Sequence, residues 1–186
     1  MINKISQNEL DEVIDKLNNE SKIYKEYKYQ NRYYDISIQR IEVLKLANLF
    51  KFKIYESNDL PLFIDANISN ENEINNIIVR SNLNSKDKKY IILYLISYYI
   101  LHINEEKINY HTSNQPLEKI QRNKDAEYIA RNLLVPKKEL IKLKNHFHNP
   151  EFCTKIFGTD EDLINLRIKE IGYKNKTLLD LFKLKR

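Results

Sequence analysis

The feature that most constrains this chain is an apolar run at residues 90–101, interrupted only by Ser97. The run is longer than an average strand, and it falls well short of the roughly 18 residues expected of a membrane span. Asn84 or Ser85 can cap a helix that starts near Lys86. Because a helix that is apolar on all sides has to be buried, the sequence predicts a core helix here.

Apolar periodicity predicts the elements before this helix. Residues 6–20 and residues 41–49 carry apolar side chains at helical spacing, which predicts two helices. Alternation at residues 50–54 predicts a strand with one buried face, and residues 62–64 and 77–79 are two further strand candidates. The structure of residues 22–36, where tyrosine and lysine interleave, is left open.

The remainder of the chain is expected to be helical. Pro116 suits the first turn of a helix that runs from Leu117 to Val135 and ends before Pro136. Four further helices are then predicted, at residues 136–146, 150–157, 160–171 and 178–184. The first is rich in lysine, and the last is amphipathic. Gly158 is expected to stop the second helix, and Thr159 with Asp162 to form the capping box of the third. Helices around a small sheet make the expected fold class α+β.

Composition limits the function classes. The chain has 186 residues and a single cysteine, so no intrachain disulfide and no cysteine-rich zinc module can form. No secretory leader is visible at the N-terminus, and we expect a cytoplasmic protein that does not enter the membrane. The net charge of +5 invites a nucleic-acid interpretation. However, the charges alternate in sign along most of the chain, which is typical of a solvated surface.

Three segments stand in a recognisable order. They are residues 77–82 with the helix 89–102, residues 125–136 (DAEYIARNLLVP) and residues 156–172 (IFGTDEDLINLRIKEIG). With residues 41–54 upstream, they resemble the ImmA/IrrE family of zinc metallopeptidases, in which the core helix carries the metal motif H-E-x-x-H. The resemblance implies a zincin-like metallopeptidase scaffold, with a small β-sheet packed on the core helix and a helical C-terminal part.

The same resemblance divides residues 1–186, a single ImmA/IrrE-like domain, into three parts. Residues 1–36 form an N-terminal helical extension, residues 37–146 the pseudo-peptidase core, and residues 150–186 a C-terminal subdomain that is similar to a helix-turn-helix.

The metal ligands of the family are missing from the matching positions. Tyr94 and Tyr98 stand where the two zinc-binding histidines would be, Leu95 replaces the general-base glutamate, and Asn123 replaces the third ligand. A tyrosine phenol stays protonated at neutral pH and is a poor zinc ligand, and leucine accepts no proton. The resemblance therefore implies a vestigial active-site cleft formed by Tyr94, Leu95, Tyr98, His102 and Asn123, with no catalytic residue, no bound metal and no cofactor.

A relocated metal site is an alternative. His102 and Glu106 have the i, i+4 spacing of one helical face, and His111 follows them in the sequence. If the helix ends near Asn104, however, these are ordinary surface side chains. The pair His146 and His148 has the same two interpretations.

The C-terminal segment 151–171 has the outline of a helix-turn-helix with Gly158 in the turn. A DNA-reading second helix needs polar or basic groups at its start, whereas this one begins with three acidic residues, 160–162. A packing role is therefore favoured, and Cys153 is interpreted as a small core residue.

The leading hypothesis is a catalytically inactive, metallopeptidase-like protein that acts by protein binding in phage or mobile-element regulation. Its partner is expected to be a repressor of the XRE type or a host protein. Two alternatives stay open. One is a metal-dependent hydrolase with a site near His102, Glu106 and His111, and the other is a nucleic-acid-binding regulator that uses the lysine-rich helix 137–147 and the basic tail 183–186.

Overall fold

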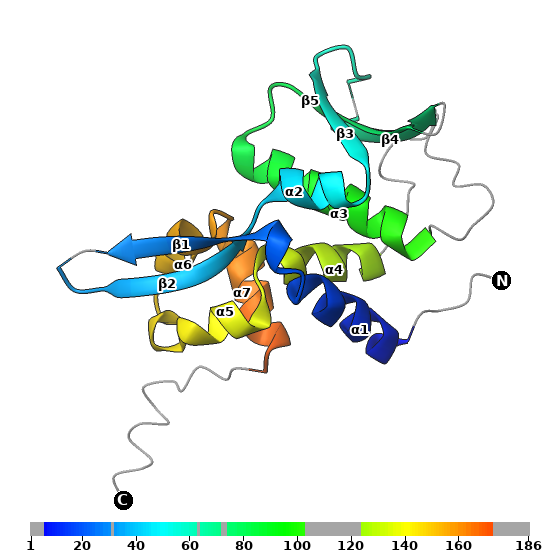
Figure 1. Ribbon diagram of the computed structural model, residues 1–186. Coiled ribbons are helices and arrows are strands. Elements are labelled where there is room, and N and C mark those ends of the chain that lie inside the picture. The colour runs from blue at the N-terminus through cyan, green and yellow to red at the C-terminus, as the bar shows by residue number, and fades with distance from the viewer. Residues whose placement is uncertain (1–5, 31, 63, 72–73, 103–123, 173–186) are drawn as a thin grey trace, which may run out of the picture. The chain divides into compact units, whose positions relative to one another are not determined.

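The computed structural model (Figure 1) describes residues 6–30, 32–62, 64–71, 74–102 and 124–172. The chain divides into two compact units, Met1–Leu134 and Val135–Arg186. Within the described ranges there are seven α-helices, a two-stranded sheet and a three-stranded sheet. The predicted α+β class is therefore confirmed.

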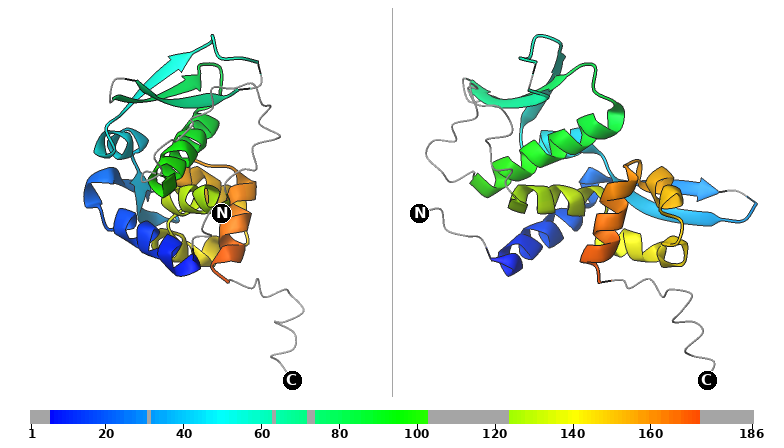
Figure 2. Two further views of the ribbon diagram at one scale, coloured as in Figure 1. Left: turned by 90° about the vertical axis from the view of Figure 1, so that its right-hand side faces the viewer. Right: turned by 180° about the vertical axis from the view of Figure 1, so that it is seen from behind.

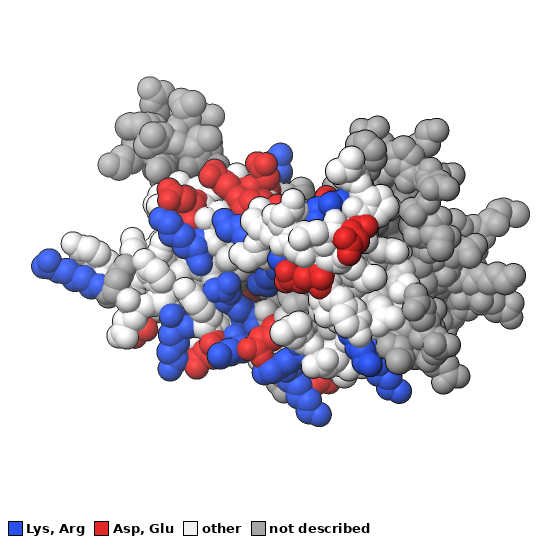
Figure 3. Space-filling model, turned by 90° about the horizontal axis from the view of Figure 1, so that it is seen from above, with Lys and Arg blue, Asp and Glu red and all other residues white. Residues whose placement is uncertain are grey.

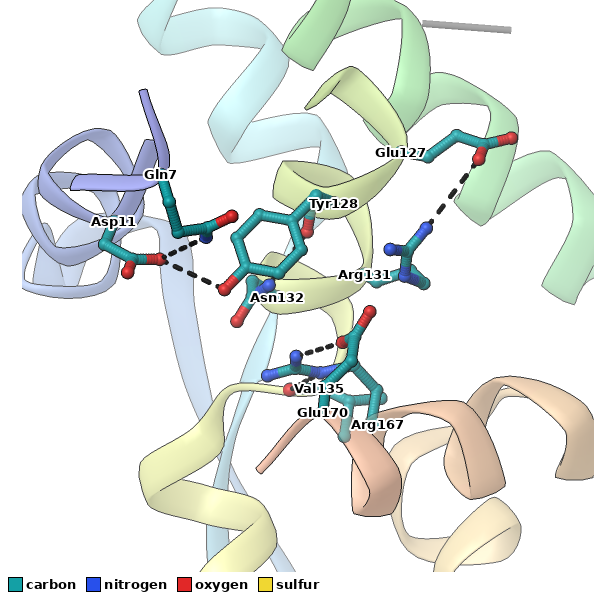
Figure 4. Close-up of polar contacts among 9 residues, drawn as sticks. All are labelled: Gln7, Asp11, Glu127, Tyr128, Arg131, Asn132, Val135, Arg167 and Glu170. Carbon is teal, nitrogen blue, oxygen red and sulfur yellow. Dashed lines mark hydrogen bonds and ion pairs between the residues drawn. The ribbon is translucent and has the colours of Figure 1, made fainter. Parts of the chain in front are cut away.

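The first unit begins with α1 (Gln7–Asn18), which confirms the helix predicted for residues 6–20. Ser6 caps the helix by accepting from the backbone N–H of Glu9, and the Glu9 carboxylate accepts from the Ser6 N–H in return. The apolar face of α1 is buried, and Tyr128 of α4 (Lys124–Leu134) donates a hydrogen bond of 3.0 Å to Asp11 of α1 (Figure 4).

The segment left open by the sequence is a short 3₁₀ turn (η1, Ser21–Ile23) followed by an antiparallel hairpin of β1 (Tyr24–Gln30) and β2 (Asp35–Ile41). The predicted start of the second helix at Ile41 is wrong, because Ile41 pairs with Tyr24 in this ladder. The helix α2 begins two residues later and spans Val43–Leu49.

The second sheet consists of β3 (Phe52–Ser57), β5 (Ile74–Arg80) and β4 (Ala66–Glu71) in that spatial order. β3 runs parallel to β5, and β4 runs antiparallel to it. The strands predicted at 50–54 and 77–79 correspond to β3 and β5.

The strand predicted at residues 62–64 is wrong. Leu62 is 86% exposed and lies in the loop that precedes β4. The guanidinium of Arg80 donates to the carbonyls of Leu60, Pro61 and Ile64 in this loop. Arg80 therefore fixes the loop from the end of the central strand.

The predicted core helix is α3 (Ser85–His102). Asn84 caps it by accepting from the backbone N–H groups of Lys86 and Asp87. No residue from 88 to 102 is exposed, which agrees with the prediction that a helix without a polar face has to be buried. Figure 2 shows α3 between the three-stranded sheet and α4, and it packs against both.

The helix predicted from Leu117 to Val135 is observed as α4 over its described part, and its expected start at Pro116 lies outside the described residues. Its inner face is fully buried and consists of small and branched side chains: Ala126, Ile129, Ala130 and Leu133. The small residues let α3 and α4 approach closely.

The second unit contains α5 (Lys137–Lys142), a 3₁₀ turn (η3, Lys144–His146), α6 (Pro150–Phe157) and α7 (Glu161–Glu170). Gly158 ends α6 in a left-handed conformation, φ 67°, as its position predicts. The predicted capping box with Thr159 is wrong. Thr159 is buried, and Asp160 caps α7 by accepting from the Leu163 N–H at 2.9 Å. The helix predicted at 178–184 lies outside the described residues.

Arg167 of α7 holds the second unit together. Its side chain is 2% exposed; its Nε donates to the Val135 carbonyl at 3.1 Å, and its Nη1 donates to the Glu170 carboxylate at 2.5 Å (Figure 4). The buried guanidinium thus ties the start of the unit to its last described helix.

Replacing Arg167→Ala is expected to lower the free energy of unfolding by about 2–4 kcal/mol, because the Val135 carbonyl and the Glu170 carboxylate lose their donor. The matched control Lys169→Ala, at an exposed position of the same helix, should change it by less than about 0.5 kcal/mol. Urea unfolding followed by circular dichroism measures both. Equal effects of the two substitutions would contradict a structural role for Arg167.

Candidate binding site

The predicted cleft residues of the core helix occupy one stretch of α3. Tyr94, Tyr98 and His102 follow each other at intervals of four residues and therefore share a face of the helix. Tyr94, Leu95 and Tyr98 are half-buried, whereas His102 is buried at 8% exposure. Asn123, the fifth predicted residue, lies outside the described residues.

Tyr98 and His102 are in direct contact. Their ring centroids lie 4.3 Å apart, with an angle of 42° between the ring planes. This tilted ring pair lies on the last described turn of α3 and engages the imidazole ring in packing. Leu95 beside it offers no group that can accept a proton. In the part of the chain that the structure describes, three or more His, Cys, Asp or Glu side chains do not gather anywhere into a metal-binding cluster.

The alternative metal site cannot be traced beyond His102. Glu106 and His111 lie outside the described residues.

Two residues that the sequence did not single out connect α3 to the sheet. Asn75 of β5 is buried, and its Nδ2 donates to the Tyr99 hydroxyl at 3.2 Å. The Tyr99 ring in turn meets Phe52 of β3 edge-on, with 4.9 Å between the ring centroids. An amide at the start of an apolar strand was the available signal, because such a side chain needs a partner when it is buried.

Lys89, on the first half of α3, is a half-buried cation. Burial, with a smaller contribution from the nearby charge of Arg40, lowers its pKa to about 8. Arg40 itself lies over the ring of Tyr27 in the β1–β2 hairpin, 4.5 Å from the ring centroid. No sequence pattern distinguishes Lys89, since lysine is common throughout this chain.

The second unit contains the remaining candidates. Cys153 is fully buried, and burial raises the pKa of its thiol to about 11, so the interpretation as a core residue is confirmed. The ring of His146 packs against Phe152, with 4.7 Å between the ring centroids. In the helix-turn-helix-like pair α6–α7, the first turn of α7 carries Glu161 and Asp162, and its Arg167 is buried. These features favour packing over DNA reading.

Charges of both signs cover the molecule. Figure 3 shows one face, on which Lys and Arg side chains lie among Asp and Glu side chains. Among the described residues, ion pairs join Lys88 to Glu56 at 2.6 Å and Lys142 to Glu139 at 2.7 Å. The mixed surface agrees with the interpretation of the charge pattern along the chain.

Comparison with known proteins gives one informative similarity. No family model matches the sequence, and no curated protein matches it. Among solved structures, a Mycobacterium tuberculosis transcriptional regulator is similar, with a TM-score of 0.53 and 14% sequence identity. The match covers 83% of this chain but only 45% of that protein, so this chain spans less than half its length. At this identity the similarity concerns the fold alone.

The described residues contain no helix that is long and apolar enough to cross a membrane.

The buried charge of Lys89 makes stability depend on pH. Its pKa is lower in the folded chain than in the unfolded chain, so unfolding takes up a proton between about pH 8 and pH 10.5. Stability should therefore rise with pH in that window. Lys89→Met is expected to be more stable than the parent by about 1–3 kcal/mol at pH 7, and this advantage should vanish near pH 10.5. Urea unfolding at several pH values measures the difference.

The exposed Lys86 on the same helix provides the control. Lys86→Met should leave stability within about 0.5 kcal/mol of the parent at every pH. An advantage of Lys89→Met that stayed constant across the pH range would show that packing, and not the buried charge, sets the effect.

Proposed function

We propose that this protein is a non-catalytic relative of the ImmA/IrrE metallopeptidases, built on a zincin-like scaffold, which regulates transcription by binding a protein partner. The observation that carries the proposal is the contact between the rings of Tyr98 and His102 on α3. The position that corresponds to a zinc-binding histidine holds an aromatic ring, and His102 packs against that ring.

The arrangement of the elements supports the scaffold. A strand (β5) leads into a buried helix (α3), and the next helix of the described chain (α4) packs against it. This is the order that the resemblance implies, in which the two helices carry the ligands on facing sides. With Tyr94, Leu95 and Tyr98 in place of His, Glu and His, such a scaffold has no means to activate water.

A regulatory role is supported by the fold similarity to a protein named as a transcriptional regulator. For the present chain we propose a role in phage or mobile-element regulation, with a repressor of the XRE type or a host protein as partner. A scaffold that grips an extended chain retains strand edges that can bind peptide after catalysis is lost.

A nucleic-acid-binding regulator is the second candidate, because Lys137, Lys138 and Lys144 are exposed around α5. Lys142 is paired with Glu139, and the neighbouring α7 begins with acidic residues, which reduces the attraction to phosphate. We therefore expect weak, nonspecific DNA binding that is lost between about 50 and 200 mM salt. A gel-shift assay that found sequence-selective, sub-micromolar binding at physiological salt would favour this candidate instead.

Zinc content tests the leading proposal. The purified protein should contain no stoichiometric zinc by elemental analysis, and chelators should leave its Tm unchanged. The variant Tyr94→His, Leu95→Glu, Tyr98→His and Asn123→Glu should rebuild a tetrahedral site with an open fourth position. It is expected to lose about 1–3 kcal/mol for each removed ring and to melt at a higher temperature with zinc than without it.

The parent chain is the control for this variant. About one zinc per parent chain would refute the non-catalytic assignment. A folded variant whose Tm ignores zinc would instead show that α3 and the following helix do not match the family in the proposed register.

A further inference from the structure

The corner where α2 meets β3 forms a shallow groove on the first unit. α2 ends at Leu49 and β3 starts at Phe52, so the helix and the strand are joined by a two-residue turn. A cavity of about 320 Å³ lies between them. Its walls mix apolar side chains, including Leu44 and Ala47 from α2 and Ile54 from β3, with the polar side chains of Asn48 and Lys53.

The lining of this groove includes large apolar side chains that are exposed to solvent. Leu44 is 65% exposed and Tyr55 is 49% exposed. Scattered apolar residues are normal on a protein surface, but a cluster beside an apolar cavity indicates an interaction site. The groove combines these exposed apolar side chains with a free edge of the three-stranded sheet.

β3 provides that edge. It pairs with β5 on one side, and no strand among the described residues pairs with its other side. An unpaired edge offers backbone N–H and C=O groups to an incoming strand. Along β3, Lys53 and Tyr55 alternate with Phe52 and Ile54, so an added strand would meet a charged and an aromatic side chain on one face.

The charge of the groove selects its occupant. Lys51 and Lys53 are exposed, and neither forms an ion pair among the described residues, whereas Lys45 and Glu42 neutralise each other. Two cations beside an apolar cavity favour an acidic segment with apolar anchors. A second copy of this chain fits less well, because pairing of two β3 edges would bring like charges together.

We propose that the α2–β3 groove, defined by Leu44, Ala47, Lys53, Ile54 and Tyr55, binds an extended acidic segment of a partner protein that adds as a strand to β3. Apolar side chains of that segment enter the cavity beside Leu44, and its carboxylates pair with Lys51 and Lys53. The proposal rests on the proposed protein-binding function and assigns that function a surface separate from the α3 residues Tyr94, Tyr98 and His102.

Selection from a phage-displayed library of random 12-residue peptides on the immobilised full chain tests the proposal. Enriched peptides should combine Asp or Glu with alternating apolar residues, and their synthetic forms should bind by fluorescence anisotropy. Leu44→Glu and Lys53→Glu are each expected to weaken binding about tenfold or more. Binding by the parent should also weaken as salt rises from about 50 to 500 mM.

Leu62→Glu is the matched control, since Leu62 is a still more exposed leucine outside the groove. It should keep the affinity within about twofold of the parent. Because Leu44 and Lys53 are themselves exposed, their variants should fold, and circular dichroism verifies this. In an added strand, only every second backbone amide of the peptide faces β3. Methylating those amides should abolish binding, whereas methylating the other amides should not.

Three outcomes would overturn the proposal: no enriched peptide, enriched peptides that bind Leu44→Glu as tightly as the parent, or enriched basic peptides. A parent chain that sediments as a dimer while Leu44→Glu sediments as a monomer would assign the groove to a second copy instead. The zinc measurement does not involve this groove. Failure of the peptide-binding experiment would therefore not count against the non-catalytic assignment. Zinc in the parent chain would likewise not count against peptide binding at the groove.

Discussion

The first unit depends on the burial of α3. A helix with no polar face is stable only if other elements cover it on all sides, and the neighbouring elements meet that requirement. Ile77 and Val79 of β5 cover one side, and α4 covers another with a face of small and branched residues. The polar groups at this interface are matched as well, since Asn75 of β5 bonds to Tyr99 and the Ser97 hydroxyl donates to the Leu93 carbonyl.

This constraint also explains what α3 can do chemically. An H-E-x-x-H helix keeps two imidazoles and a carboxylate around a solvated metal, so part of its surface has to stay polar and open. At the corresponding positions α3 carries Tyr94, Leu95 and Tyr98, and Tyr98 packs on His102. The proposed non-catalytic assignment and the burial of the helix are therefore consistent with each other, because a face without metal ligands can be filled with rings. Lys89 differs from these residues because it is a half-buried cation on the same helix, and burial lowers its pKa.

Apolar periodicity predicted α1 and β3, and uninterrupted apolar runs predicted α3 and β5. The prediction failed where local chemistry decides the structure. In the hairpin, β1 interleaves tyrosine with charged residues, and the short alternation of Ile36 and Ile38 in β2 was left without an assignment. Residues 62–64 have the apolar composition of a strand. The segment is a loop instead, and the side chain of Arg80, 16 or more positions away, donates to carbonyls of this loop. In the site, the spacing of Tyr94, Tyr98 and His102 was predictable from the sequence. The contact between Asn75 and Tyr99 was not, because it depends on how β5 packs against α3 in the folded chain.

Exposed apolar surface is unfavourable in water, so its location is informative in a chain whose core helix is so completely covered. The side chains of α3 are buried or half-buried throughout its second half, whereas Leu44 of α2 and Tyr55 of β3 remain exposed in the walls of one groove. Leu46 and Ala47 are buried and anchor α2, and this leaves Leu44 toward solvent. The exposed apolar side chains therefore gather at the corner of α2 and β3 that the proposed binding function uses, and not on α3.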